Sequence, residues 1–293
     1  MITVNSISGG KTSAYLASQF PADYNIFQLV RLNTIDCLWK EGKDEPVRNL
    51  ISDRIGMEFI GTAEDDEIIY TILDLEQYLG TEIKILTADY SFEEMIKQHN
   101  DRYLPSPLRR YCTTELKIEP TFNWWLNNFN EVVEMRIGYR ANEMSRMKKM
   151  LKKCDENRLM PFEHVVGSKE TKKGLQNIWE TTFWQKPVFP LIEEVPTWKD
   201  SIEIFWKDKP IRFAAKNNCL ICPHSELLWL KYQWEINPQK MEVAASFERN
   251  RKYTNDTLKA NKDITYDKIR EMKLTGKLTL SDFSECDSGV CGF

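Results

Sequence analysis

Short apolar runs alternate with segments of helical spacing over the first 140 residues. Strand-like runs rich in β-branched or other apolar residues occupy positions 2–7, 25–32, 57–60, 82–87 and 131–137. Between them, helical spacing or helix-start signals occur at 11–20, 44–55, 65–79, 92–99 and 116–129. This alternation predicts a mostly parallel β-sheet with helices on both faces.

The pattern changes after about residue 150. Residues 148–153 are basic and helical, whereas 155–190 mix Trp, Phe, Thr and Pro without a clean period. Two further helices are predicted at about 225–236 and 238–251. We therefore predict an α/β domain over 1–205 and a helical, cysteine-containing C-terminal region over 206–293.

Composition narrows the class of protein. Only 12 of the 293 residues are Gly and 12 are Pro, which excludes a low-complexity chain. The net charge of −4 excludes a protein whose whole surface binds nucleic acid. No signal-peptide pattern is present and no stretch approaches the roughly 20 apolar residues of a membrane span, so a cytoplasmic protein is expected. Seven cysteines are too few for a disulfide scaffold, and in a reducing compartment they indicate metal or redox chemistry.

A glycine-rich turn lies between the first predicted strand and the first predicted helix. It consists of Ser8, Gly9, Gly10, Lys11, Thr12 and Ser13. Two glycines allow a tight turn and close approach of an anion, and the N-terminus of the next helix supplies N–H groups and a positive dipole end. The spacing is not that of a Walker P-loop. Phosphate binding is predicted, with a plain turn as the alternative.

Positive charge gathers in two later segments. Arg109, Arg110 and Lys117 surround the single Cys112. The other segment follows the predicted strand at 131–137 and contains Gly138, Arg140, Glu143 and Arg146. Guanidinium groups suit phosphate recognition, and ligands of open α/β sheets bind at carboxyl ends of strands. The alternative for the second segment is a solvated ion-pair face.

Four cysteines form two pairs near the C-terminus. Cys219 and Cys222 have the C-x-x-C spacing of metal ligands, and Cys286 and Cys291 form the second pair. Thiolates suit both zinc and iron–sulfur clusters, so residue type does not decide between them. A redox dithiol and buried free cysteines are the alternatives. Cys37 and Cys154 fit no such pattern and are predicted to be structural.

Together these segments resemble the PP-loop ATP pyrophosphatases and the phosphoadenosine-phosphosulfate (PAPS) reductase family. SGGKTS at 8–13 is similar to their pyrophosphate loop, RRYCTTELKIEP at 109–120 to their R-x-C-T-x-x-x-K-x-x-P segment, and GYRANEMSR at 138–146 to their G-x-R-A-x-E-x-x-R segment. Asn33-Thr34 resembles an NT pair that lies near the nucleotide in the family. The resemblance implies an adenine nucleotide alpha hydrolase-like (Rossmann-like) core, with a variable insertion at about 61–104.

The resemblance also implies a set of functions. The first is a PP-loop enzyme that activates a substrate with ATP and Mg²⁺, giving AMP and pyrophosphate, in a reaction linked to sulfur transfer. Nucleotide-binding roles then fall on residues 8–13, Asn33, Thr34, Arg109, Arg110, Lys117 and Gly138, and catalytic roles on Lys11, Arg140, Glu143 and Arg146. The second is a PAPS or adenylyl-sulfate reductase with a thioredoxin-like reductant and Cys286, next to Glu285, as nucleophile. A third is a non-catalytic nucleotide- or partner-binding module.

The metal prediction stays open in the same way. Family members with a [4Fe–4S] cluster carry two adjacent cysteines where this chain has Cys112-Thr113, so one ligand is absent. Either a [4Fe–4S] cluster or Zn²⁺ on Cys219, Cys222, Cys286 and Cys291, with Cys112 as a further candidate, satisfies the chemistry, and the resemblance favours the cluster. His224 is a further candidate ligand, with a structural role as its alternative. A sulfur donor is an expected partner, and the basic run at 146–153 is either a nucleic-acid contact or a solvated helix face.

Overall fold

The protein is described by a computed structural model that covers residues 1–39, 44–99, 103–171, 174–250, 257–259, 261, 263–274, 276 and 278–279. Its centre is a six-stranded sheet in the order β5-β2-β1-β6-β8-β7. The strands are β1 (Thr3–Ile7), β2 (Tyr24–Gln28), β5 (Ile83–Leu86), β6 (Val133–Ile137), β7 (Met160–Thr171) and β8 (Gly174–Val188). All neighbouring pairs are parallel except β7 with β8. The predicted α/β class with a mainly parallel sheet is confirmed.

Helices cover both faces of this sheet. On one face, α1 (Lys11–Gln19) and α3 (Glu67–Leu79) pack against Ile7 of β1 and Phe27 of β2. On the other face, α6 (Glu119–Asn128) and α7 (Met144–Leu151) pack against the neighbouring residues Val4 and Ile26. Adjacent residues of a strand point to opposite faces, so these buried runs fill two separate cores.

The remaining short elements join these layers. They are β3 (Arg31–Leu32), α2 (Glu45–Ile55), β4 (Gly61–Thr62), α4 (Phe92–Gln98), α5 (Tyr111–Thr113), α8 (Pro190–Glu193) and α9 (Lys199–Trp206). Ser91 caps α4 because its hydroxyl accepts from the Glu94 N–H, as predicted, and the Glu94 carboxylate accepts from the Ser91 N–H. The strand predicted at 57–60 does not form, and the neighbouring Gly61–Thr62 pairs with β3 instead. The region 61–104 contributes β5, which is one of the two edge strands of the six-stranded sheet.

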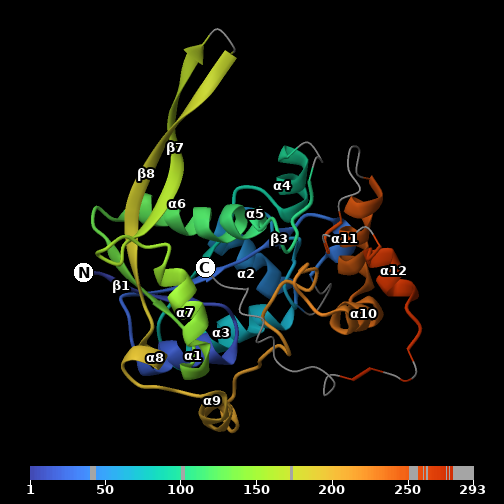
Figure 1. Ribbon diagram of the computed structural model, residues 1–293. Coiled ribbons are helices and arrows are strands. Elements are labelled where there is room, and N and C mark those ends of the chain that lie inside the picture. Colours follow the sequence, from blue (N-terminus) through green and yellow to red (C-terminus); the bar gives the residue numbers. More distant parts are fainter. Residues whose placement is uncertain are drawn as a thin grey trace.

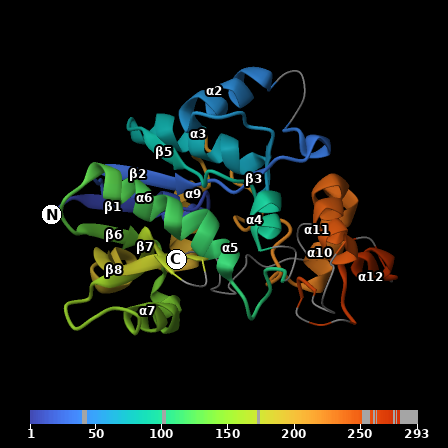
Figure 2. The same ribbon diagram turned by 90° about the horizontal axis from the view of Figure 1, so that it is seen from above.

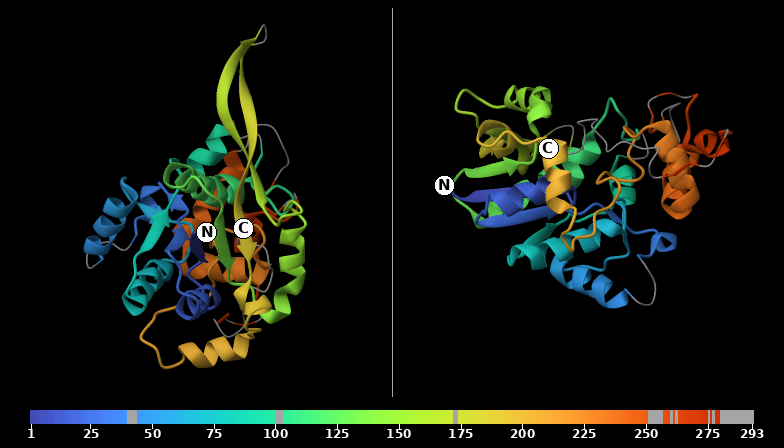
Figure 3. Two further views of the ribbon diagram at one scale, coloured as in Figure 1. Left: turned by 90° about the vertical axis from the view of Figure 1, so that its left-hand side faces the viewer. Right: turned by 90° about the horizontal axis from the view of Figure 1, so that it is seen from below.

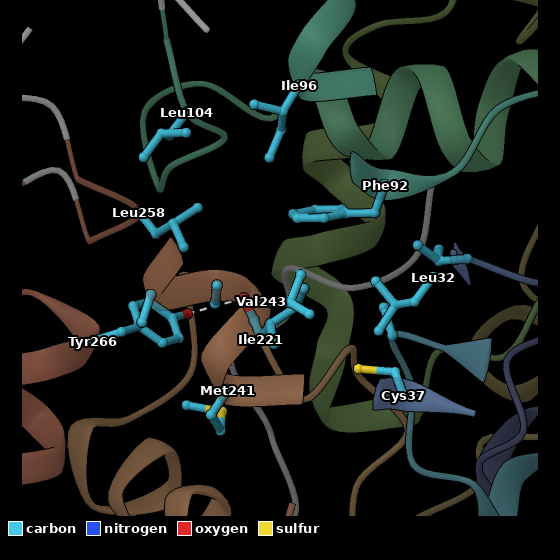
Figure 4. Close-up of a cluster of buried hydrophobic side chains, with 14 of the residues drawn as sticks. Leu32, Cys37, Phe92, Ile96, Leu104, Ile221, Met241, Val243, Leu258 and Tyr266 are labelled. Carbon is cyan, nitrogen blue, oxygen red and sulfur yellow. Dashed lines mark hydrogen bonds between the residues drawn. The ribbon is translucent and has the colours of Figure 1, made fainter. Parts of the chain in front are cut away.

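A third core lies beneath the C-terminal helices α10 (Leu227–Ile236), α11 (Pro238–Asn250) and α12 (Tyr266–Glu271), which stand beside the sheet (Figures 1 and 2). Figure 4 shows Leu32, Phe92 and Ile96 from the first part of the chain facing Ile221 and Met241 from the last part. The residues predicted as two regions, 1–205 and 206–293, therefore share one apolar cluster.

The strands β7 and β8 form a long hairpin that extends away from the body (Figures 1 and 3). Its base is fixed by Trp184, which is fully buried, whereas Trp179 and Leu175 farther along β8 are exposed. This hairpin occupies most of the stretch 155–190, in which no clean hydrophobic period is present. Among the described residues, no helix is both long and apolar enough to cross a bilayer.

Candidate nucleotide and cysteine site

The site begins where the strand order reverses. The chain passes from β1 to β2 and β5 on one side, and then returns to place β6 on the other side of β1. Ligands of open parallel sheets bind at such a switch point, beyond the carboxyl ends of the strands. The segment after β1 (residues 8–13, the glycine loop) and the segment that begins with Gly138 after β6 flank this point.

Backbone geometry shapes the glycine loop. Gly9 has φ +75°, and a Cβ there would come within 2.6 Å of Ile68 Cγ2 on α3. Ser13, in the first turn of α1, closes the loop, since its Oγ accepts from the Ser8 N–H at 3.0 Å and donates to the Gly10 carbonyl at 3.1 Å. The loop is therefore a tight turn at the N-terminus of α1, and anion binding there stays a prediction.

The second segment is pressed against the first. A Cβ on Gly138 would lie 3.1 Å from Ser13 Cα and 3.2 Å from its nitrogen, so any other residue would push the backbone at Ser13 away by a few tenths of an ångström. Farther along, Glu143 accepts from the Arg140 N–H at 2.9 Å and from Arg140 Nε at 3.1 Å, and it also pairs with Arg146. Both carboxylate oxygens of Glu143 thus contact arginines, Oε2 contacting Arg140 and Oε1 contacting Arg146.

Two predicted nucleotide-binding groups are engaged elsewhere. Lys11 pairs with Glu203 of α9, and its carbonyl accepts from Trp206 Nε1 at 2.9 Å. The N–H groups of Asn33 and Thr34 both donate to Glu93 of α4 at 2.9 Å. Contact between these three residues and a nucleotide stays a prediction.

The cysteines Cys112, Cys219 and Cys222 line a single cavity of about 50 Å³, which has room for an ion or a water or two. Arg110, Lys117 and His224 line the same cavity, which we call the cysteine pocket. Cys112 lies in α5 and Lys117 in a π-helical turn (Thr114–Ile118) that leads into α6. Such turns are frequent at functional sites. The pocket thus joins the arginine-rich segment to the C-x-x-C pair.

Hydrogen bonds to distant segments and within the turn hold the turn of Cys219–Cys222 (residues 219–222, the cysteine turn). Cys219 Sγ donates to Glu64 Oε1 at 3.6 Å, the Leu220 N–H donates to the Ala63 carbonyl at 2.7 Å, and the Cys222 N–H donates to the Cys219 carbonyl at 3.0 Å. Ile221 is buried in the third core, where its carbonyl accepts from Tyr266 Oη at 2.9 Å (Figure 4).

Burial and nearby positive charges both shift pKa values in the cysteine pocket, in opposite directions for Cys112 and in the same direction for His224. Burial raises the pKa of Cys112, against the positive charges of Arg110 and Lys117. Burial also lowers the pKa of His224 to about 4, with help from Arg110 and Lys259. Arg110 acts on Tyr139 as well, beside Arg140, because it opposes the rise that burial causes in the pKa of that phenol. Arg110 therefore lies near the cysteine pocket and also close enough to Tyr139 for a small effect on its pKa, after burial and the larger effect of Arg146.

Three residues in contact with the site were not predicted from the sequence: Glu64, Lys240 and Asn217. Glu64 is 1% exposed and is 3.3 Å from Lys117 Nζ, and the buried Lys240 donates to the Glu64 carbonyl at 2.6 Å. Asn217 Nδ2 donates to Ser8 Oγ in the glycine loop at 2.8 Å. None of them belongs to a motif, so only their burial or contacts reveal them.

The metal prediction is partly outside the described residues. Cys286 and Cys291 fall there, as does Glu285. Within the described ranges, no group of three or more His, Cys, Asp or Glu side chains is arranged to hold a metal. His224 Nε2 is nevertheless buried without a hydrogen-bond partner, and thiols and imidazole are the donors that zinc and iron–sulfur sites use. The pocket fits a sulfur-ligated metal in donor type. Cys37, by contrast, lies in the core, and burial raises its pKa to about 11.

Comparisons with known proteins give one structural likeness. Neither the family models nor the curated proteins contain a match to this chain. Among solved structures, the chain is similar to phosphoadenylyl-sulfate (PAPS) reductase from Candida auris in its phosphate complex. The identity is 12% and the TM-score 0.34, over 73% of this chain and 75% of that one. A likeness at this level carries no information about activity.

Proposed function

We propose that this protein is an adenine-nucleotide enzyme that activates a substrate with ATP and releases pyrophosphate. The observation that carries the proposal is the close packing of the glycine loop on Gly138 at the switch point of the sheet. In the reaction, a substrate oxygen attacks the α-phosphorus, the bond to the β-phosphate oxygen breaks, and pyrophosphate leaves while AMP stays on the substrate.

The residues divide this work between them. The N–H groups and hydroxyls of the glycine loop hold the leaving pyrophosphate, as helix N-termini hold anions elsewhere. Arg140 and Arg146, both oriented by Glu143, neutralise charge that develops on the phosphates. Lys11 joins them by exchanging Glu203 for a phosphate oxygen.

We also propose that the cysteine pocket serves sulfur chemistry linked to this activation. Cys219 and Cys222, with Cys112 and His224 beside them and Cys286 and Cys291 from the C-terminal residues, would hold Zn²⁺ or a [4Fe–4S] cluster. A resident metal would bind or deliver sulfur to the activated substrate. Iron, zinc and acid-labile sulfide measured on anaerobically purified protein test this, and stoichiometric zinc without iron overturns the cluster in favour of Zn²⁺.

Nucleotide binding is the first test of the whole proposal. ATP with Mg²⁺ at a hundredfold excess over Kd should raise the Tm by roughly 5 °C or more. Arg140→Gln should reduce that shift, and Arg249→Gln, an exposed ion-pair residue on α11, should not. If neither ATP nor PAPS shifts the Tm, the proposal fails in favour of a module that binds another partner. Sulfite formed from PAPS, and lost in Cys286→Ser, would instead establish the reductase.

A further inference from the structure

A short connection joins the glycine loop to the cysteine turn. Asn217 Nδ2 donates to Ser8 Oγ at 2.8 Å, and two residues later Cys219 begins the turn. The amide of Asn217 also packs directly on Gly10, where a Cβ would meet Nδ2 at 2.7 Å. Asn217 therefore lies over the N-terminus of α1, where an anion would bind.

The other end of this connection is anchored firmly. The Leu220 N–H donates to the Ala63 carbonyl, and Cys219 Sγ donates to the buried Glu64. Residues 63–66 are in turn held by Lys240, whose Nζ donates to the Glu64 carbonyl and to Asp66 Oδ1 at 2.7 Å. Movement at Asn217 is therefore not absorbed by a loose segment, because only Asn218 lies between Asn217 and the fixed turn.

An anion in the loop would compete for the groups that make this connection. The Ser8 hydroxyl has one O–H and accepts from Asn217, and its oxygen lies 3.1 Å from Ser13 Oγ. A phosphate oxygen only accepts hydrogen bonds, so it would accept them from the Ser8 O–H and from the N–H groups of the Asn217 amide. Either exchange changes the contact that holds residue 217.

We infer that Asn217 is a positioning residue that couples the two halves of the site, so that pyrophosphate or ATP held in the glycine loop changes the stability of the cysteine turn. The inference rests on the proposed nucleotide binding. It adds that the loop and the sulfur chemistry are linked through one side-chain hydrogen bond, which would allow the cysteines to respond to whether the nucleotide site is filled.

Hydrogen exchange of the as-purified protein tests the coupling without ligand. Ser8→Ala, Asn217→Ala and the double variant are compared with wild type at the amides of Leu220 and Cys222. Each single change should speed exchange about fivefold, the factor that one net hydrogen bond supplies, and the double variant should add nothing more. Asn237→Ala, which removes an amide at the end of α10 bonded to Gln233 at 2.7 Å, is the matched control and should leave the turn unchanged.

The same measurement with ATP and Mg²⁺, or with pyrophosphate, completes the test. Ligand should alter exchange at Leu220 and Cys222 at least twofold in wild type and leave it unaltered in Asn217→Ala. If ligand protects the loop amides but leaves the turn unchanged in wild type, or if the single variants act additively, the coupling is wrong while nucleotide binding stands. If neither ligand protects the loop, the proposed function fails, and the ligand dependence inferred here fails with it.

Discussion

The glycine loop and the cysteine turn lie at opposite ends of one site and present different atoms to a ligand. The loop offers backbone N–H groups, and its shape depends on positions where a side chain has no room, such as Gly9 against Ile68 and Gly138 against Ser13. The cysteine turn offers thiols, and its backbone is held by ordinary bonds to Ala63 and within the turn. The loop is thus damaged by adding an atom, whereas the turn is damaged by removing one.

This difference separates two kinds of evidence for function. A backbone site leaves a clear mark in the sequence, because few residues besides glycine fit it. A thiol site is marked by its spacing, but its supporting residues are side chains from distant segments, including Glu64 and Lys117. Substitutions in the glycine loop and around the cysteine turn therefore test whether the two depend on different features, namely close backbone packing and side-chain groups.

The largest effect is expected from removing thiols. Cys219→Ser and Cys222→Ser should each lower the metal affinity of the anaerobically purified protein by about 100-fold or more, since loss of a ligand costs more than loss of a supporting residue. Cys154→Ser is the control, because Cys154 lies after α7, where its Sγ is 3.8 Å from the Met150 carbonyl. Elemental analysis checks the result, and full metal content in a Cys219→Ser, Cys222→Ser double variant would exclude a metal role for this pair.

Adding one carbon to the loop should come next. Gly9→Ala places a Cβ at a φ of +75° and against Ile68, so strain and overpacking should weaken ATP binding by about tenfold to 100-fold. Gly80 has a φ of +66° and open space around it, so Gly80→Ala introduces the same backbone strain without a steric contact. It should leave the ATP affinity unchanged. Calorimetric titration with ATP and Mg²⁺ measures both, and an unchanged affinity in Gly9→Ala would show that the loop does not hold the nucleotide.

A smaller effect is expected at the carboxylate behind the cysteine turn. Glu64→Gln removes a buried charge that faces Lys117 and accepts from Thr62, so it should lower the free energy of unfolding by about 2 kcal/mol. Urea denaturation measures this loss. Glu82→Gln, an exposed carboxylate 3.5 Å from Lys84, should cost less than about 1 kcal/mol. Equal costs would mean that the burial of Glu64 has no energetic consequence.

The smallest effect concerns the segment that leads to Asn217. Arg212 donates to both oxygens of Asp74, at 2.7 and 2.6 Å, and this pairing lowers the pKa of Asp74. A lowered acid pKa gives stability that is present above the unfolded value of about 3.9 and is lost as the pH falls through the folded value. Asp74→Asn should therefore cost about 1 kcal/mol at pH 7 and less at pH 3. Thermal unfolding at both pH values checks this, and a cost that grows on acidification would contradict the pairing.

Much of the central sheet follows from sequence, and the exceptions have physical reasons. In the run at 131–137, the buried Val133, Met135 and Ile137 alternate with the half-buried Glu134 and Arg136, and β6 forms there. The β7–β8 hairpin was missed because most of its length packs against no core, so no alternation marks it. The apolar run at 57–60 was read as a strand, but Phe59 fills the core from a loop.

The candidate site divides in the same way. The glycine loop and the arginine segments were recognisable because each motif is continuous in sequence. That Cys112 joins Cys219 and Cys222 around one cavity was only a possibility until the fold placed α5 against the cysteine turn. The roles of Asn217 and Glu64 come from hydrogen bonds to Ser8 and Cys219, which are 209 and 155 residues away in the sequence. No local sequence pattern records such contacts.

The shared third core has a consequence for how the protein is made. A chain emerging from the ribosome presents Leu32, Phe92 and Ile96 long before Ile221, Met241 and Tyr266, which cover them. Domains that fold from the N-terminus usually complete their own core first. Here the nascent α/β part keeps apolar surface uncovered until about residue 270 has been synthesised. Translation speed and chaperone supply late in synthesis should therefore determine how much folded protein a cell obtains.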